Sequence, residues 1–308
     1  MNRFLSKSQK INVLKIAFSL VLLVSLAIGF QNFTNKHEFS QILQTMGSPW
    51  YLISIFGLLF FNIYAESRKW RALHTTSIHS LVAIRAVLAG YSTATLSPNR
   101  VAEFAGRSAI FPERIRPELN TATFIGSFIQ GAVTVGFGLL SLFVVPFGAG
   151  FIRRLNFESI AWLMGLCLLV FFGIYLFRTK ISAQLSDYFK ALKKLSLDQV
   201  MKAFLWAVFR YVVFLFQFYL ALLLFGFEGS FLIAATGISC MYMVQSYIPL
   251  SGLGELGVRE FLCFTIFGSY MSIASAAFFP ALVIWVINIA LPSLTGLIML
   301  KTHLHFAR

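Results

Sequence analysis

The chain has 308 residues, of which 58% are hydrophobic and only 12% carry a charge. A soluble domain has about 25% charged residues, so this composition excludes an ordinary soluble protein and predicts a polytopic, all-α membrane protein. The formal charge of +14 would suggest a nucleic-acid partner in a soluble protein. Here most Lys and Arg residues fall on one side of the predicted topology, as the positive-inside rule describes, so we expect membrane lipids and no nucleic acid as partners.

The first half contains three predicted transmembrane helices. The basic stretch MNRFLSKSQK precedes the first apolar run, and because no small-residue cleavage site follows that run, we expect a retained helix. A second, short run lies between Pro49 and Glu66. The polar and basic segment ESRKWRALHTTSIHS comes next and is expected to form an interfacial helix at the inner membrane surface. The expected spans of this half cover residues 11–30, 50–65 and 119–147.

A helical hairpin is predicted between the second and third spans. Residues 81–96 and the arm that ends at Phe111 are each too short to cross the membrane, and the break Ser97-Pro98-Asn99 separates them. Basic residues flank the pair on both sides, which favours a re-entrant hairpin that enters from the inside and returns. Irregular backbone at membrane depth is tolerated only where protein or water satisfies its polar groups.

The second half repeats this order after a shift of 152 residues. Its hairpin has arms at 231–248 and 256–268 around the break PLSGLGE. Because the first half has an odd number of crossings, the second half is expected to insert upside down. This predicts one membrane domain with about six spans, two re-entrant hairpins, inverted repeats of about 1–150 and 151–308, and both termini in the cytoplasm. The expected spans of this half cover residues 159–177, 203–225 and 273–300.

Two Glu-x-x-x-Arg pairs follow the two breaks. Glu103 and Arg107 correspond to Glu255 and Arg259 under the same shift. Each pair has i, i+4 spacing with the Glu first, which is the better orientation on a helix. A charge near the bilayer centre costs roughly 2.5–3.5 kcal/mol, and pairing offsets only part of this cost. Two roles remain open for each pair: a structural salt bridge, or a binding site for an anionic headgroup between the hairpin tips.

The helix that begins after each break favours the second role. Its first N–H groups have no intrahelical partner and attract phosphate or carboxylate. Arg107 and Arg259 would lie one turn inside these helices, with Arg100 in the first break, and a guanidinium group can bind two phosphate oxygens. The glutamates could orient the arginines or carry a proton. Among the polar residues inside the spans, Arg210 is the best groove candidate, and Gln130, Gln217, Gln245 and Asn288 are expected to form interhelical hydrogen bonds.

The glycine-rich second break matches a dinucleotide-binding fingerprint in letters only. Gly252, Gly254 and Gly257 fit G-x-G-x-x-G, but apolar helices stand where this motif needs a βαβ unit. We expect these glycines to permit a tight turn that exposes N–H groups to a headgroup. The sequence has no nucleophile–base motif, metal-ligand pattern or P-loop, so we expect no enzymatic activity, cofactor or metal site.

The two motifs resemble those of the flippase-like family that includes the transmembrane region of lysylphosphatidylglycerol synthases. Its members show Pro-x-Arg-x-Gly-Glu…Arg and, later, Pro-x-x-x-Gly-x-Gly…Gly-x-Arg-Glu, which are PNRVAEFAGR and PLSGLGELGVRE here. Ala102 stands where the family usually has Gly. The resemblance implies lipid translocation in a bacterial inner membrane, without the lysyl transfer that belongs to a separate soluble domain. It points to Pro98, Arg100, Glu103, Arg107, Gly252, Gly254, Glu255, Gly257, Arg259 and Glu260.

We therefore expect a flippase or transporter that moves a phosphate-bearing lipid through a groove between the hairpins. Arg100, Arg107 and Arg259 would hold the headgroup, and Glu103 and Glu255 would act as counter-ions or proton carriers. Recycling of a polyprenyl phosphate carrier would use the same chemistry. The alternative from a different class is a membrane scaffold or assembly factor in which the charges are purely structural.

Overall fold

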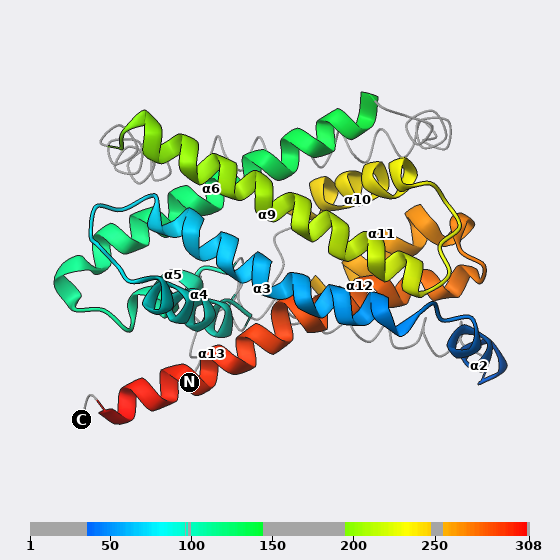
Figure 1. The fold of residues 1–308 in the computed structure, drawn as a ribbon, viewed down its shortest axis with the longest axis horizontal. Coiled ribbons are helices and arrows are strands. Elements are labelled where there is room, and N and C mark those ends of the chain that lie inside the picture. Colours follow the sequence, from blue (N-terminus) through cyan, green and yellow to red (C-terminus); the bar gives the residue numbers. More distant parts are fainter. Residues whose placement is uncertain (1–35, 96, 98–99, 144–194, 248–254, 307–308) are drawn as a thin grey trace, which may run out of the picture.

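The computed structural model describes residues 36–95, 97, 100–143, 195–247 and 255–306, and the regular elements of this part are helices (Figure 1). In the first half they are α2 (Lys36–Gln44), α3 (Pro49–Arg71), α4 (Ser80–Thr95), α5 (Ala102–Ser108), a 3₁₀ turn (Glu113–Ile115) and α6 (Arg116–Phe143). In the second half they are α9 (Leu197–Leu224), α10 (Phe231–Ser246), α11 (Glu255–Phe267), 3₁₀ turns at Gly268–Tyr270 and Ala274–Ala277, α12 (Phe278–Trp285), a π-helical segment (Val286–Ala290) and α13 (Leu291–Phe306).

Four segments of the described part are long and apolar enough to cross a membrane, which supports the predicted membrane class. Two further predicted spans, at 11–30 and 159–177, lie outside the described residues. The short helices expected on either side of both breaks are present. The four candidate spans are Pro49–Arg71, Glu113–Leu142, Leu197–Leu224 and Ala274–Lys301.

The second span is longer than predicted, and the interfacial helix expected after residue 65 is wrong. α3 begins at Pro49, where the Ser48 side chain accepts a hydrogen bond from the Trp50 backbone N–H, and it continues without interruption to Arg71. Glu66 and Lys69 are buried in its last two turns. They form an ion pair of 2.6 Å at i, i+3 spacing, which is compatible with continued helix and offsets part of the cost of burying both charges.

α3 and α9 form the centre of the described part and run in opposite directions (Figure 1). Both helices contribute to two apolar clusters: Ile55 and Phe218 belong to one, and Trp70 and Ala207 to the other. The stretch of α3 and α9 between these clusters carries polar side chains, among them Arg210. The fold therefore places a polar layer at mid-length of its two central helices.

The two short helix pairs pack on opposite halves of the chain. α4 packs on α5 and on α13, and α10 packs on α11 and on α6. α4 and α5 cross where glycine allows close contact: a Cβ at Gly106 would lie 2.6 Å from the Ala89 carbonyl oxygen. Where α13 crosses α4, a Cβ at Gly296 would lie 1.9 Å from the Leu88 carbonyl oxygen. These crossings fix α4 and α5 against the body of the protein.

Candidate functional site: a charged cavity between both halves

A cavity of about 500 Å³ opens where the first short helix pair meets the central helices. Its wall takes residues from α3, α4, α5, α6 and α9, from the loop that joins α4 to α5, and from the last residue of α10. A volume of this size is typical of small-ligand sites. The lining residues are Glu66, Lys69, Tyr91, Arg100, Glu103, Phe104, Phe124, Ser127, Phe128, Gln130, Gly131, Thr134, Arg210 and Ser246.

Glu66 of α3 is the centre of the charged network. Its carboxylate lies 2.6 Å from Lys69 Nζ, 2.7 Å from Arg107 Nη2 and 2.8 Å from Arg210 Nη1. Its side chain is only 5% exposed. The three cations come from three helices, α3, α5 and α9, so a single buried carboxylate connects both halves of the chain.

Glu103 of α5 is the second carboxylate, and it forms the i, i+4 ion pair with Arg107 that the sequence predicts. Arg107 is 3% exposed and does not line the cavity: it lies behind the wall, where it donates to both Glu66 and Glu103. Its guanidinium also lies 6.0 Å from the centre of the Trp70 ring. Arg107 thus fixes the positions of the two carboxylates.

Arg100 lies in the break between α4 and α5 and reaches the cavity directly. Its backbone φ is +55°, the left-handed region that non-glycine residues adopt rarely and at a cost of about 1–3 kcal/mol. Its Nε donates to Glu103 Oε2 at 3.2 Å, and its guanidinium lies 5.4 Å from the centre of the Tyr91 ring. About a third of the side chain is exposed, so the guanidinium remains accessible from the cavity. Backbone strain of this kind is concentrated at functional sites.

Arg210 of α9 also lines the cavity, as expected for a groove residue. It donates to Asn62 Oδ1 at 2.7 Å, to the Tyr91 hydroxyl at 3.1 Å and to Gln130 Oε1 at 3.4 Å. Gln130 also accepts a hydrogen bond from Lys69. Partners on three helices, α3, α4 and α6, therefore hold the guanidinium of Arg210 in one orientation.

An amide network continues from Arg210 toward the second half. Asn62 and Asn288 both donate to Gln217 Oε1, at 3.5 and 3.0 Å, and Gln217 donates to the Ile55 carbonyl at 2.8 Å. Asn288 lies in the π-helical segment, a rare conformation that is frequent at functional sites. The predicted interhelical hydrogen bonding of Gln130, Gln217 and Asn288 is confirmed.

Cationic groups exceed carboxylates in this network. Among the described residues of this network, the cations are Lys69, Arg100, Arg107 and Arg210 and the carboxylates are Glu66 and Glu103, a formal difference of two positive charges. The excess lies inside an apolar helical protein, where an uncompensated charge is costly. The cavity is therefore suited to an anionic group that would complete the pairing.

The described residues of the second motif are absent from the wall of this cavity. Arg259 is 4% exposed, and its guanidinium lies 5.7 Å from the centre of the Tyr242 ring on α10. Glu260 is also buried, and it accepts a hydrogen bond from the Gly257 backbone N–H, where φ is +98°. Neither Arg259 nor Glu260 is among the described residues that line the cavity, and a headgroup site shared by Arg107 and Arg259 stays a prediction.

Three predicted site residues lie wholly or partly outside the described residues. Gly252 and Gly254 lie outside the described residues, and so does the side chain of Glu255, whose backbone begins α11. Gly257 has the positive φ that its role in a tight turn requires.

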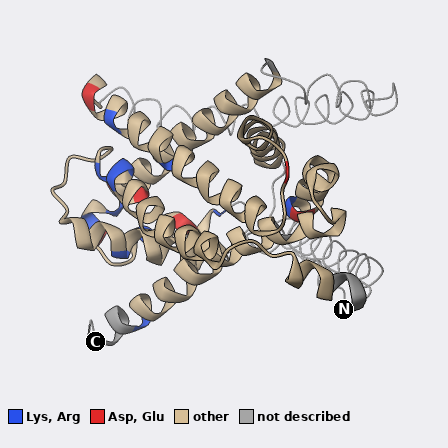
Figure 2. Cartoon of the chain, turned by 45° about the vertical axis from the view of Figure 1, so that its right-hand side comes forward, with Lys and Arg blue, Asp and Glu red and all other residues tan. Residues whose placement is uncertain are grey.

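Two site residues, Glu66 and Lys69, were missed because they follow the apolar run that defined the second span. Their i, i+3 spacing was the sequence feature that could have indicated an ion pair on a continued α3 helix. Figure 2 shows that Lys and Arg of the described part gather toward one end of the protein, and the last turn of α3, with Arg68, Lys69 and Arg71, lies in this region.

The comparison with known families matches nearly the whole chain. A family model described as "Lysylphosphatidylglycerol synthase TM region" matches residues 12–296. No curated protein and no solved structure gives a significant match. The matched range includes every residue that lines the cavity.

Proposed function

Because the chain belongs to the family of the lysylphosphatidylglycerol synthase transmembrane region, we propose that it transports a phosphate-bearing lipid across the membrane. The observation that supports this most strongly is the cavity of about 500 Å³, whose described wall carries the cations Lys69, Arg100 and Arg210 and the carboxylates Glu66 and Glu103, with Arg107 buried behind it. The phosphate of the lipid supplies negative charge to the cavity. The acyl chains of the lipid stay in the bilayer.

In this proposal, Arg100 and Arg210 hold the headgroup, and Lys69 adds a third positive charge. A guanidinium group presents a planar fork that matches two phosphate oxygens, and its hydrogen bonds to an anion are about twice as strong as neutral ones. Arg107 acts as a positioning residue, because it is buried and holds Glu66 and Glu103 in place. The two carboxylates keep the arginines paired when no lipid is bound.

The topology that we propose is the inverted repeat with two re-entrant helix pairs. The reciprocal packing of α4 on α13 and of α10 on α6 supports it, since a pseudo-two-fold axis would exchange these two contacts. We place the basic end of the protein, with both termini, on the cytoplasmic side of a bacterial inner membrane. The lipid would cross without any covalent change, so we propose a transporter and not an enzyme.

The test is lipid movement by the purified protein in sealed liposomes, followed with fluorescent phospholipids and with a polyprenyl phosphate. We expect the wild type to move at least one of these phosphate lipids, and we expect Arg210→Gln to abolish the movement. Arg85→Gln is the matched control, since Arg85 is an exposed arginine of α4 that does not line the cavity. It should keep wild-type activity.

Two outcomes would overturn the proposal. A folded wild-type protein that moves no phosphate lipid would favour a scaffold in which the charges are structural. Equal transport by wild type and folded Arg210→Gln would remove the cavity from the pathway. Because Arg210 is paired to Glu66, the melting temperature of each variant must accompany its activity.

A further inference from the structure

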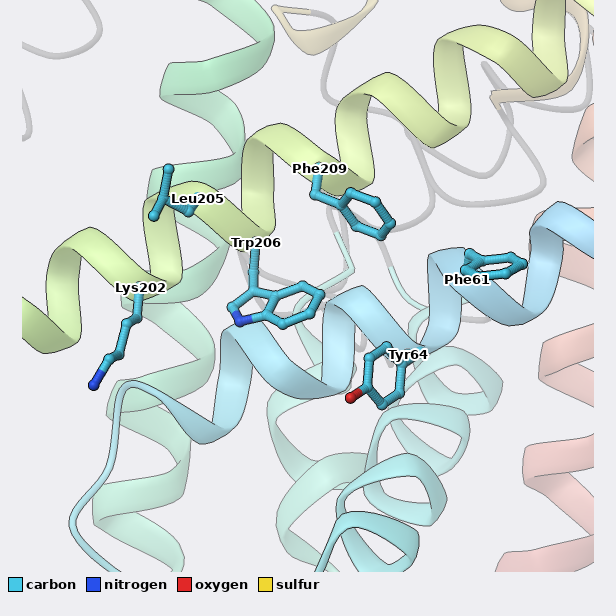
Figure 3. A pocket seen from close by; sticks show the side chains of 6 residues that line it. All are labelled: Phe61, Tyr64, Lys202, Leu205, Trp206 and Phe209. Atoms are coloured by element: carbon cyan, nitrogen blue, oxygen red, sulfur yellow. The ribbon is translucent and has the colours of Figure 1, made fainter.

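A second cavity lies on the outer side of α3 and α9, apart from the charged one. It has a volume of about 490 Å³ and shares no lining residue with the first cavity. Figure 3 shows that side chains of α3 and of α9 line it from both sides. The lining residues are Phe61, Tyr64, Lys202, Leu205, Trp206 and Phe209.

Arg68 of α3 provides a cation at one end of this groove. Its guanidinium lies 5.5 Å from the centre of the Trp206 ring and 6.0 Å from that of Tyr64, so two aromatic rings orient it. It is half-buried, and no carboxylate of the described residues lies within ion-pair distance of it. The neighbouring Lys69, by contrast, is paired to Glu66 on the inner side of the same helix.

Lys202 provides a second cation at the same end, because α3 ends where α9 begins. Its Nζ lies 2.6 Å from Asp198 Oδ2, and both side chains are mostly exposed. An ammonium group has three donors, so this contact leaves Lys202 able to bind a second anion. Arg68 and Lys202 thus form a pair of cations, and in the part of the chain that the structure describes Asp198 is the one carboxylate paired with them.

The polarity of the groove changes in one direction along the two helices. Beyond the cations come Tyr64 and Trp206, whose rings have a polar edge and are typical of the membrane interface. Phe61 and Phe209 lie one turn further along each helix and have no polar atom in their side chains. A phospholipid has the same order: a phosphate, a glycerol backbone and acyl chains.

We propose that this groove holds one anionic phospholipid. Arg68 and Lys202 bind its phosphate and headgroup, and an acyl chain lies along Phe61 and Phe209. The site is peripheral to the charged cavity and its occupant is retained, whereas the proposed transport site releases its lipid. Charge complementarity and the matched polarity of groove and lipid support this site, which does not depend on the transport function.

The full-length protein in lipid nanodiscs provides the test, through quenching of Trp206 fluorescence by brominated lipids. Subtracting the spectrum of a Trp206→Phe variant isolates the signal of Trp206 from that of the other tryptophans. One series increases brominated phosphatidylglycerol in unlabelled phosphatidylcholine, and the other increases brominated phosphatidylcholine in unlabelled phosphatidylglycerol. We expect half-maximal quenching at a several-fold lower fraction of the anionic lipid.

Arg68→Gln should raise the half-maximal fraction of brominated phosphatidylglycerol by about fivefold, since one Lys or Arg near an anionic surface contributes about that factor. Arg71→Gln is the matched control. Arg71 belongs to the same basic turn of α3, but its Nη1 donates to Ser80 Oγ at 2.6 Å and it does not line the groove. We expect Arg71→Gln to change the half-maximal fraction of brominated phosphatidylglycerol little.

Three results would overturn the proposal. Equal quenching by both lipids would make the groove an ordinary lipid-facing wall. Quenching by neither lipid would mean that protein, such as a second copy of the chain, covers Trp206. Equal shifts in Arg68→Gln and Arg71→Gln would indicate surface charge without a defined site. Replacing Arg68 can itself change the fluorescence of Trp206, because the guanidinium lies against the indole ring. The quenching of each variant is therefore divided by the fluorescence intensity of that variant without brominated lipid.

Discussion

Glu66 Oε1 of α3 accepts a hydrogen bond from Arg107 Nη2 of α5 at 2.7 Å, across 41 positions of the chain. This contact connects a spanning helix to the short helix that follows the first break. Arg107 also donates to Glu103, so one buried guanidinium sets the separation of both carboxylates. With Arg107 committed to this role, Arg100 and Arg210 are the arginines that face the cavity.

Glu66→Gln should be the most destabilising single charge removal in the network. The amide keeps the shape of the side chain but leaves Lys69, Arg107 and Arg210 without their shared carboxylate. Breaking a buried ion pair costs about 3–5 kcal/mol, so we expect a marked fall in melting temperature in detergent.

Glu113→Gln is the matched control for this change. The Glu113 carboxylate is 91% exposed and lies 3.6 Å from Arg116 Nη1, and such surface pairs contribute at most about 1 kcal/mol. A loss of stability in Glu66→Gln no larger than that in Glu113→Gln would contradict the central place of Glu66.

Arg100→Gly should reduce lipid movement while leaving the stability of the protein nearly unchanged. Glycine adopts the left-handed φ of +55° without strain, which offsets the loss of the partly exposed ion pair and of the contact with Tyr91. We expect a free energy of unfolding within about 1 kcal/mol of wild type. Lipid movement should fall by roughly tenfold, because a charge-assisted hydrogen bond to the headgroup is lost.

The liposome transport assay and the melting temperature together check this prediction. Unchanged transport by Arg100→Gly would show that its guanidinium does not contact the lipid. A large loss of stability would show that the left-handed conformation is not a source of strain.

Gly296→Ala should destabilise the protein, because it forces α13 and α4 apart. The added Cβ would lie 1.9 Å from the Leu88 carbonyl oxygen, so one of the two backbones must move. Overpacking of this kind costs about 1–3 kcal/mol. Gly136→Ala is the control: it is also in a spanning helix, but its Cβ would meet nothing within 4 Å among the described residues.

Thermal melting in detergent measures both glycine variants. Alanine is favoured over glycine in a helix by about 1 kcal/mol, so Gly136→Ala should be neutral or slightly stabilising. Equal melting temperatures for the two variants would contradict the close approach of α13 and α4.

His74 should make stability depend on pH. This histidine follows α3, is 6% exposed and packs on Trp70 with ring centres 5.0 Å apart. Burial lowers its pKa below the ordinary value of about 6.5, so the unfolded chain binds a proton more readily than the folded one. Its contribution to stability is fully present above that value and is lost as the pH falls below it toward the lowered folded pKa.

The measurement is the melting temperature from pH 8 to pH 5 for wild type, His74→Phe and His79→Phe. His74→Phe should flatten the decline below about pH 6.5, whereas replacement of the exposed His79 should leave it. The same decline in all three proteins would assign the pH dependence to other groups.

Local features of the fold were predictable from the sequence because they depend on residues close together in the chain. The helix pair around Ser97 and the pairing of Glu103 with Arg107 both follow from helix length, a proline break and i, i+4 spacing. The position of Arg210 in the cavity wall was also expected, since a lone arginine inside an apolar span needs a polar site.

The composition of the site was less predictable because it depends on distant contacts. The sequence predicts that the second apolar span ends before Glu66. In the structure Glu66 is buried, and Arg107 and Arg210, which lie far away in the sequence, stabilise its burial. Likewise, the repeat predicted that Arg259 would join Arg107 at one headgroup. In the structure, Arg107 is held by Glu66 of α3, and the guanidinium of Arg259 lies against the Tyr242 ring of α10, contacts that a repeat in the sequence does not reveal.

The most direct test of the account compares a fluorescent phospholipid with a phosphate-free glycolipid of the same acyl chains, in sealed liposomes that contain the wild-type protein. Recognition of phosphate by the excess cations of the cavity predicts that the protein moves the phospholipid between leaflets and leaves the glycolipid where it is. Equal movement of both lipids, or movement of neither by a folded protein, would contradict it.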